Sequence, residues 1–243
     1  MKILWCLLFF SFNSLGITES DLISRYQSDI FPYYQEYPIN FFPYHDDKAK
    51  KFPFKLFTKN SKNLLVILPG KGEQIERYAE TIFDLRPVDA DILLLQFRGQ
   101  GKASRALSDH EKAHIENFDD VVEDMHALFV KLNIRERYKK INLLAHSMGG
   151  HHGLRFQAKY GDFDEIILNS PLVGLFNERE TLLNYYMVKV LDLIGLSNFY
   201  VPGGGSWRDR KFENNQLSHS SSRFSKIRDI ERRSPNYRSG SVT

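Results

Sequence analysis

Short apolar runs alternate with stretches of helical periodicity from about residue 52 to residue 171. Continuous apolar runs bounded by turn residues are typical of buried parallel strands, and they occur at 63–70, 90–99, 139–147 and 163–171. Apolar residues at three- and four-residue spacing predict amphipathic helices at 72–85, 117–132 and 148–160. A further run at 52–59 predicts an edge strand. This short alternation predicts an α/β fold, with a mostly parallel sheet and helices on both faces.

The segments on either side of this alternation lack its period. Residues 17–50 are rich in Tyr, Phe and Pro, and they predict an irregular arm whose aromatic side chains cover the core. Residues 180–196 carry apolar side chains on almost every side, as expected of a helix that covers an apolar pocket. The chain beyond residue 203 has nine Lys or Arg against four Asp or Glu. It predicts a solvated loop, with contact to an anionic membrane as the alternative.

The first sixteen residues have the layout of a secretory signal peptide. Lys2 precedes an apolar run over 3–12, and Ser14 and Gly16 satisfy the small-residue rule for cleavage after Gly16. The run is short for a membrane span, and an uncleaved anchor is the alternative. The only cysteine, Cys6, lies within this segment, so cleavage would leave no disulfide. We therefore expect an exported protein, located in the periplasm, at the outer membrane or outside the cell.

Composition narrows the range of partners. Hydrophobic residues make up 42% and charged residues 26% of the 243 residues, which is the balance of a globular protein with one sizeable domain. The formal net charge of +3 is too small to imply a nucleic-acid partner. The sequence has neither a zinc-type spacing of Cys and His nor a phosphate-binding glycine loop, so we expect no metal and no cofactor.

The segment 141–153, INLLAHSMGGHHG, contains the main candidate for chemistry. A buried strand runs into Ser147, glycines follow at 149 and 150, and a helix begins. This context is typical of an exposed serine nucleophile, although a serine that merely caps the helix is the alternative. The backbone N–H of Met148, at the helix start, and that of Lys71, in the turn PGKGE, are the candidates to bind an oxyanion.

Five segments in order resemble α/β-hydrolases of the bacterial lysophospholipase and monoacylglycerol lipase group, which includes serine aminopeptidase-like hydrolases. The segments are ILPGKGEQIERYAE, LLLQFRGQGKAS, ENFDDVVEDM, LLAHSMGG and IILNSPL. The resemblance implies an α/β-hydrolase domain at 51–243, with Ser147 as nucleophile, Lys71 and Met148 as the oxyanion hole, and a lid at about 175–205 over an acyl pocket. Many members have His where this chain has Pro69 and Asp where it has Gln96, and neither position belongs to the catalytic triad.

The base that Ser147 needs is not evident from the sequence. In this fold the triad follows the order Ser, acid, His, and the later histidines are His151, His152 and His219. The first two lie in the helix that leaves the turn and are expected to pack there, whereas His219 stays as an internal candidate. His146 is expected to be a buried, hydrogen-bonded neighbour. The resemblance places acid and base after two further strands, so we expect a chain truncated before them, its last strand left as an unpaired edge.

Two classes of function are open from the sequence. The first is an exported serine hydrolase that cleaves lysophospholipid- or monoacylglycerol-type esters through an acyl-enzyme on Ser147, with a peptidase as a variant. The second is a catalytically inactive remnant or an acyl-binding protein without turnover. The expected partners are a small lipid ester and, through the lid, a membrane surface. Glu73, Arg77 and Arg98 are expected to fix the loop and the helix start.

Overall fold

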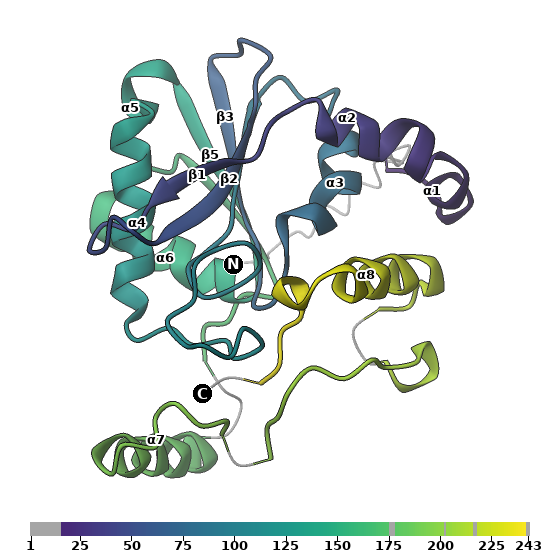
Figure 1. The fold of residues 1–243 in the computed structure, drawn as a ribbon. Coiled ribbons are helices and arrows are strands. Elements are labelled where there is room, and N and C mark those ends of the chain that lie inside the picture. The colour runs from purple at the N-terminus through teal and green to yellow at the C-terminus, as the bar shows by residue number, and fades with distance from the viewer. Residues whose placement is uncertain (1–15, 175–177, 202, 216–217, 242–243) are drawn as a thin grey trace, which may run out of the picture.

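The computed structural model describes residues 16–174, 178–201, 203–215 and 218–241, so residues 1–15 of the predicted signal peptide lie outside it. One sheet has the strand order β1-β2-β4-β3-β5-β6. The strands are Asn40–Pro43 (β1), Lys51–Phe57 (β2), Asn63–Leu68 (β3), Asp91–Leu95 (β4), Lys140–His146 (β5) and Glu165–Asn169 (β6). β1 and β2 pair antiparallel with their neighbours, and β3 to β6 are mutually parallel (Figure 1). The predicted α/β fold with a mostly parallel sheet is confirmed.

The two sides of the sheet end differently. The run at 52–59 predicts an edge strand, but this is wrong because β1 pairs with the outer side of β2. At the other side β6 pairs with β5, and within the described ranges no strand lies beyond it. Ile167 of β6 is 58% exposed. The structure therefore shows the apolar edge that the sequence predicts for this strand.

Helices cover both faces of the sheet, as predicted. On one face, α4 (Phe118–Lys131) and α6 (Met148–Tyr160) share a core with β3 and β5. On the other face, α3 (Ala79–Asp84) packs with the arm against Ile67, Ile92 and Leu94. The short α5 (Ile134–Arg137) follows α4. The helical spacing of α4 orients Val121, Val122, Met125, Leu128 and Phe129 into the core, and the side chain of Asn117 caps its first turn.

The first half of the arm, residues 19–35, is helical, which corrects the prediction of an irregular segment. It comprises α1 (Glu19–Arg25), a π-helical turn (Tyr26–Ile30) and α2 (Phe31–Gln35), which lead into β1. Leu22, Tyr26, Ile30 and Tyr34 recur every fourth residue, and all four are buried against the sheet face that α3 also covers. This is a helical period. The density of aromatic residues and prolines around it obscured the period in the sequence.

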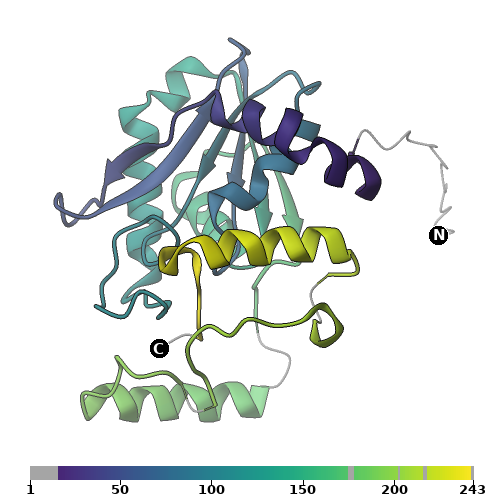
Figure 2. The ribbon, with the colours of Figure 1, turned by 45° about the vertical axis from the view of Figure 1, so that its right-hand side comes forward.

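Two helices follow the sheet. α7 (Glu178–Leu193) stands off the sheet on the side where the parallel strands end (Figures 1 and 2). α8 (Ser221–Arg233) packs against α1 and the 3-10 turn Ile75–Tyr78, and it buries Phe224 and Ile230. The prediction of a solvated loop beyond residue 203 is therefore wrong for α8. Among the described helices none has both the length and the apolar character needed to cross a bilayer.

Candidate active site

Ser147 occupies a strained turn between β5 and α6. Its backbone angles are φ 50° and ψ −118°, a conformation that L-residues rarely adopt. Strain of this kind costs on the order of 1–3 kcal/mol and collects at functional sites. The Ser147 side chain makes no capping hydrogen bond to α6. The alternative that Ser147 merely caps the helix therefore does not fit the structure, and its hydroxyl is not committed to the helix.

The surrounding backbone holds this turn in place. Ser147 N–H donates to the carbonyl of Asn169 at the end of β6 (3.1 Å), and the Ser147 carbonyl accepts from Leu172 N–H (2.9 Å). A Cβ at Gly149 would lie 2.3 Å from the carbonyl oxygen of Leu68, at the end of β3. Only glycine allows α6 to approach β3 this closely. Strand ends on both sides of β5 thus fix the position of Ser147.

The turn after β3 lies directly beside Ser147. A Cβ at Gly70 would be 3.2 Å from Ser147 Cβ, so the two turns are in contact. Lys71 follows Gly70, and its Nζ donates to the carbonyl of Gly240 (2.8 Å), where burial lowers its pKa. Met148 is the first residue of α6 and is buried. The structure thus places the Gly70–Lys71 turn and the first residue of α6 beside Ser147, and the oxyanion role of Lys71 and Met148 stays a prediction.

Glu73 connects the turn after β3 to the serine turn. Its carboxylate accepts from Gly70 N–H (2.6 Å) and from the Tyr78 hydroxyl (2.8 Å), and it pairs with His146 Nδ1 (3.0 Å). Burial alone would raise the pKa of Glu73, but the hydrogen bonds from His146, Gly70 and Tyr78 hold it below its usual value. The same contact raises the pKa of His146. His146 is therefore hydrogen-bonded, as the sequence predicts, but it is not buried as predicted, because its side chain is 36% exposed.

Two glutamines brace the same loop, and the sequence did not single out either as a brace. Gln96 Nε2 donates to the carbonyl of Glu73 (2.9 Å), and Gln100 Oε1 accepts from Gly72 N–H (2.7 Å). Both are buried. Gln96, which stands where many family members have Asp, thus makes a structural hydrogen bond to this loop. No sequence pattern indicates these contacts, because they join residues 23 and 28 positions apart.

The other histidines lie away from the hydroxyl or are engaged in packing. His152 is fully buried, its ring packs 4.6 Å from that of Phe97, and burial lowers its pKa to about 3. The ring of His151 packs against Phe118. His219 is exposed, and the neighbouring Ser220 donates to Glu19 of α1. No contact within the described residues joins His219 to the serine turn.

A charged cluster lies at the end of β1 and was not predicted as a metal site. His45, Asp46 and Asp124 bring possible ligand atoms within 4.8 Å of one another, the one such group in the described part of the chain. Arg98 donates to Asp124 (2.8 and 2.9 Å) and to Asp46 (2.9 Å). The guanidinium already balances these carboxylates, and the cluster ties the arm to α4. Arg98 is therefore structural, as expected.

Comparison with known proteins agrees with this arrangement. Residues 59–243 match the model of the family described as serine aminopeptidase, S33. Lysophospholipase L2 of Escherichia coli (strain K12) is 30% identical over 181 residues, which are 74% of this chain and 53% of that protein. A probable lysophospholipase L2 of Haemophilus influenzae is 23% identical, over 89% of this chain and 69% of the relative. The chain thus spans about half the length of the first relative.

Two solved structures share the fold. A thermostable carboxyl esterase from Bacillus coagulans superposes with a TM-score of 0.56 at 18% identity, over 69% of this chain and 54% of the esterase. A carboxylesterase structure from Nitrososphaera gargenis superposes with a TM-score of 0.54 at 17% identity, over 82% of this chain and 67% of that one. The chain belongs to the serine aminopeptidase S33 family of α/β-hydrolases, the family of its lysophospholipase relatives.

Proposed function

We propose that the protein is an exported serine hydrolase that cleaves lysophospholipid- or monoacylglycerol-type esters. The observation that carries the proposal is the strained backbone of Ser147, whose hydroxyl makes no helix cap although it stands at a helix start. A serine that only stabilised α6 would not need this conformation. The relatives named lysophospholipase L2 support the ester class.

The chemistry follows from the two turns that meet at Ser147. Ser147 Oγ attacks the ester carbonyl, the alcohol leaves, and water then releases the fatty acid from the acyl-enzyme. The N–H groups of Lys71 and Met148 would stabilise the negative oxygen of the tetrahedral intermediates. Glu73 holds His146 and the Gly70 turn together, so it positions this hole. The acid and the base come, in this proposal, from sequence outside the 243 residues, with His219 as the internal alternative.

α7 is proposed to contact the membrane that holds the substrate. Leu183, Tyr186 and Leu193 are 70%, 64% and 86% exposed, and their spacing along α7 places them on one side of the helix. The segment after α7 exposes Arg208 and Arg210, and no acid within the described residues pairs with either. An apolar helix with nearby cations favours an anionic bilayer surface. Export, proposed from residues 1–16, would bring this surface to an outer membrane or to the medium.

The test of the hydrolase uses two lengths of chain. The 243-residue protein and a protein extended through the downstream codons of the gene are each prepared with Ser147 and with Ser147→Ala. Labelling by a fluorophosphonate probe and fatty-acid release from a lysophospholipid and a monoacylglycerol are measured, with an aminoacyl anilide as the peptidase control. We expect Ser147-dependent ester cleavage in the extended chain and weak labelling in the 243-residue chain.

The other outcomes assign the alternatives. Strong labelling of the 243-residue chain that is lost in His219→Ala would place the base at His219. If labelling and fatty-acid release were the same with Ser147 and with Ser147→Ala in both the 243-residue and the extended protein, the proposed hydrolase function would be overturned. Fatty-acid binding by these proteins would then indicate an acyl-binding protein. Cleavage of the anilide alone would indicate the peptidase variant.

The membrane contact is tested by co-sedimentation with vesicles that contain phosphatidylglycerol. Leu193→Glu places a charge on α7, and Val130→Glu places the same charge on α4 at another exposed apolar position. We expect Leu193→Glu to reduce the bound fraction severalfold and Val130→Glu to leave it unchanged. Equal binding of both variants and the parent would contradict the contact.

A further inference from the structure

A cavity lies between the arm, the sheet and α8. Its volume is about 320 Å³, within the range of small-molecule sites. The apolar wall consists of Phe31, Tyr34, Tyr37, Pro38, Ile39 and Ile230. None of the residues that line it belongs to the serine turn or to the Gly70–Lys71 turn. The cavity is therefore distinct from the candidate active site.

Lys55 of β2 lines this cavity, and it is unusual because a lysine side chain is rarely buried. Its side chain is only 2% exposed, and Nζ donates to the Tyr34 carbonyl (2.5 Å) and lies 3.4 Å from the centre of the Tyr34 ring. No carboxylate among the described residues forms an ion pair with it. Burial lowers the pKa of Lys55 to about 8, so the ammonium form still predominates at neutral pH. A buried cation without a counter-ion is unfavourable, and an anion bound beside it would remove that cost.

The charge of Glu76 favours the ammonium form of Lys55, but the two side chains form no ion pair. Glu76 is the one acid in the lining, and its Oε1 is already engaged by Lys102 Nζ (2.7 Å) and the Tyr237 hydroxyl (3.2 Å). Arg233 stands at the end of α8 without an acidic partner among the described residues. Lys55, Lys102 and Arg233 against Glu76 leave the cavity with an excess of positive charge.

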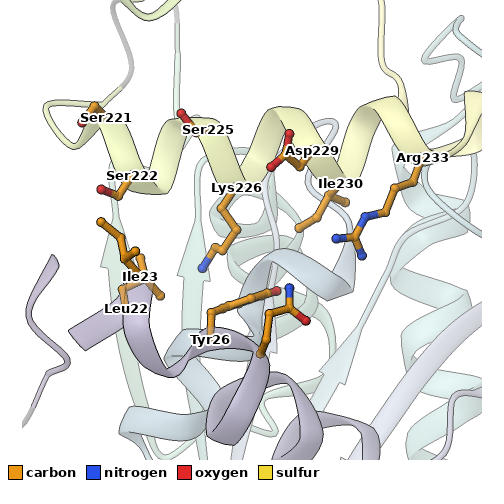
Figure 3. Close-up of a pocket in the computed structure, with 11 residues that line it drawn as sticks. Leu22, Ile23, Tyr26, Ser221, Ser222, Ser225, Lys226, Asp229, Ile230 and Arg233 are labelled. Carbon is orange, nitrogen blue, oxygen red and sulfur yellow. The ribbon is translucent and has the colours of Figure 1, made fainter. Parts of the chain in front are cut away.

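Two further observations indicate what kind of anion fits. Glu76 Oε2 is buried and has no hydrogen-bond partner in the described part of the chain, so a donor on a ligand would satisfy it. The aromatic and aliphatic wall favours an apolar body over a fully hydrated inorganic ion. The neighbouring groove between α1 and α8 shares Ile230 and Arg233 with the cavity, and Figure 3 shows the Arg233 side chain reaching from α8 toward the arm. Arg233 therefore stands where it would attract an anion to the mouth.

We propose that this cavity binds a small organic carboxylate that carries a hydroxyl group on an aromatic or short aliphatic body. The carboxylate pairs with Lys55 Nζ, Arg233 adds positive potential at the mouth, and the body packs on Phe31, Tyr34 and Tyr37. The site does not depend on Ser147, and so the proposal goes beyond the hydrolase function.

The experiment uses the full 243-residue chain, with 4-hydroxybenzoate as the probe and 4-hydroxybenzyl alcohol as the matched neutral compound. Binding is measured by titration calorimetry and by ligand-observed NMR. Lys55→Met removes the charge and keeps an apolar stem of similar length, which a buried position tolerates. Arg233→Gln is an exposed change that leaves the fold intact, and Lys62→Met is the matched control, because Lys62 is exposed and lies outside the cavity.

We expect saturable binding of the acid, with Lys55→Met weakening it about tenfold or more, as for loss of a charge-assisted hydrogen bond. Arg233→Gln should weaken it about threefold, because an exposed charge contributes less. Lys62→Met should not change it. Equal binding of the acid and the alcohol, unchanged affinity in folded Lys55→Met, or no binding of the acid at about 10 mM would each overturn the proposal.

Discussion

The close approach of α6 to β3 predicts that Gly149→Ala destabilises the protein. A Cβ at this position would lie 2.3 Å from Leu68 O and 2.6 Å from Pro69 O, whereas real Cβ atoms essentially never come within 3.0 Å of such atoms. The clashing atoms are backbone oxygens at the end of a central strand, so they cannot rotate aside. Relief requires α6 or the turn after β3 to shift.

The magnitude follows from two opposing effects. Alanine in a helix is favoured over glycine by about 1 kcal/mol, whereas overpacking of a close contact costs up to about 3 kcal/mol. The expected net loss in the free energy of unfolding is therefore about 2 kcal/mol. For a chain of this size that corresponds to a fall in Tm of roughly 4–8 °C. The shift also moves Gly70 and Ser147, so fluorophosphonate labelling of Ser147 should fall.

The assay is urea and thermal unfolding followed by far-UV circular dichroism. Gly205→Ala is the control, because its Cβ would meet nothing within 4 Å and its backbone needs no positive φ. That variant should lie within about 0.5 kcal/mol of the parent. If Gly149→Ala unfolded at the same or a higher urea concentration than the parent, the contact between α6 and β3 would not be as close as the structure shows.

Three further predictions concern the serine turn and the buried histidine. Glu73→Gln removes the group that raises the His146 pKa and leaves the burial that lowers it, so NMR titration should give a lower His146 pKa; an unchanged value would contradict the ion pair. Because the pKa of Glu73 is lowered and that of His146 raised, the pair stabilises the fold between the two values, and its contribution is lost as pH falls through the first or rises through the second. Ser147→Gly should be more stable to urea than Ser147→Ala by about 1 kcal/mol, because glycine adopts a positive φ without strain, and identical midpoints would argue against strain. The pKa of His152 lies at about 3 in the folded protein against 6.5 ordinarily, so the unfolded chain takes up a proton first and stability falls as pH drops below 6.5. His152→Leu should make this fall shallower in unfolding experiments at several pH values, and an equal slope would show that His152 is protonated in the fold.

The local hydrophobic pattern was sufficient to predict those strands and helices that bury one face or both faces in the core. The strands with continuous apolar runs and the helices at 117–132 and 148–160 were predicted within two residues of their observed bounds, except that the run at 90–99 extends four residues beyond the end of β4. The agreement arises because burial imposes its period on the sequence. The serine turn was predicted for the same reason, since a strand, a serine and two glycines are adjacent in the chain. The arm was missed because its period of four residues is set in a background of Tyr, Phe and Pro.

What only the tertiary structure decided is the set of contacts between distant segments. β1 pairs with β2 and is therefore the edge strand of the sheet. α8 packs on α1, and Gln96 and Gln100 form hydrogen bonds to the turn after β3. The sequence by itself determined the fold class and the place of Ser147, because hydrophobic periodicity and turn chemistry act over a few residues. The contacts that hold Ser147 and the burial of Lys55 depend on which surfaces meet in three dimensions. A local sequence pattern does not indicate which distant segment will pack against it.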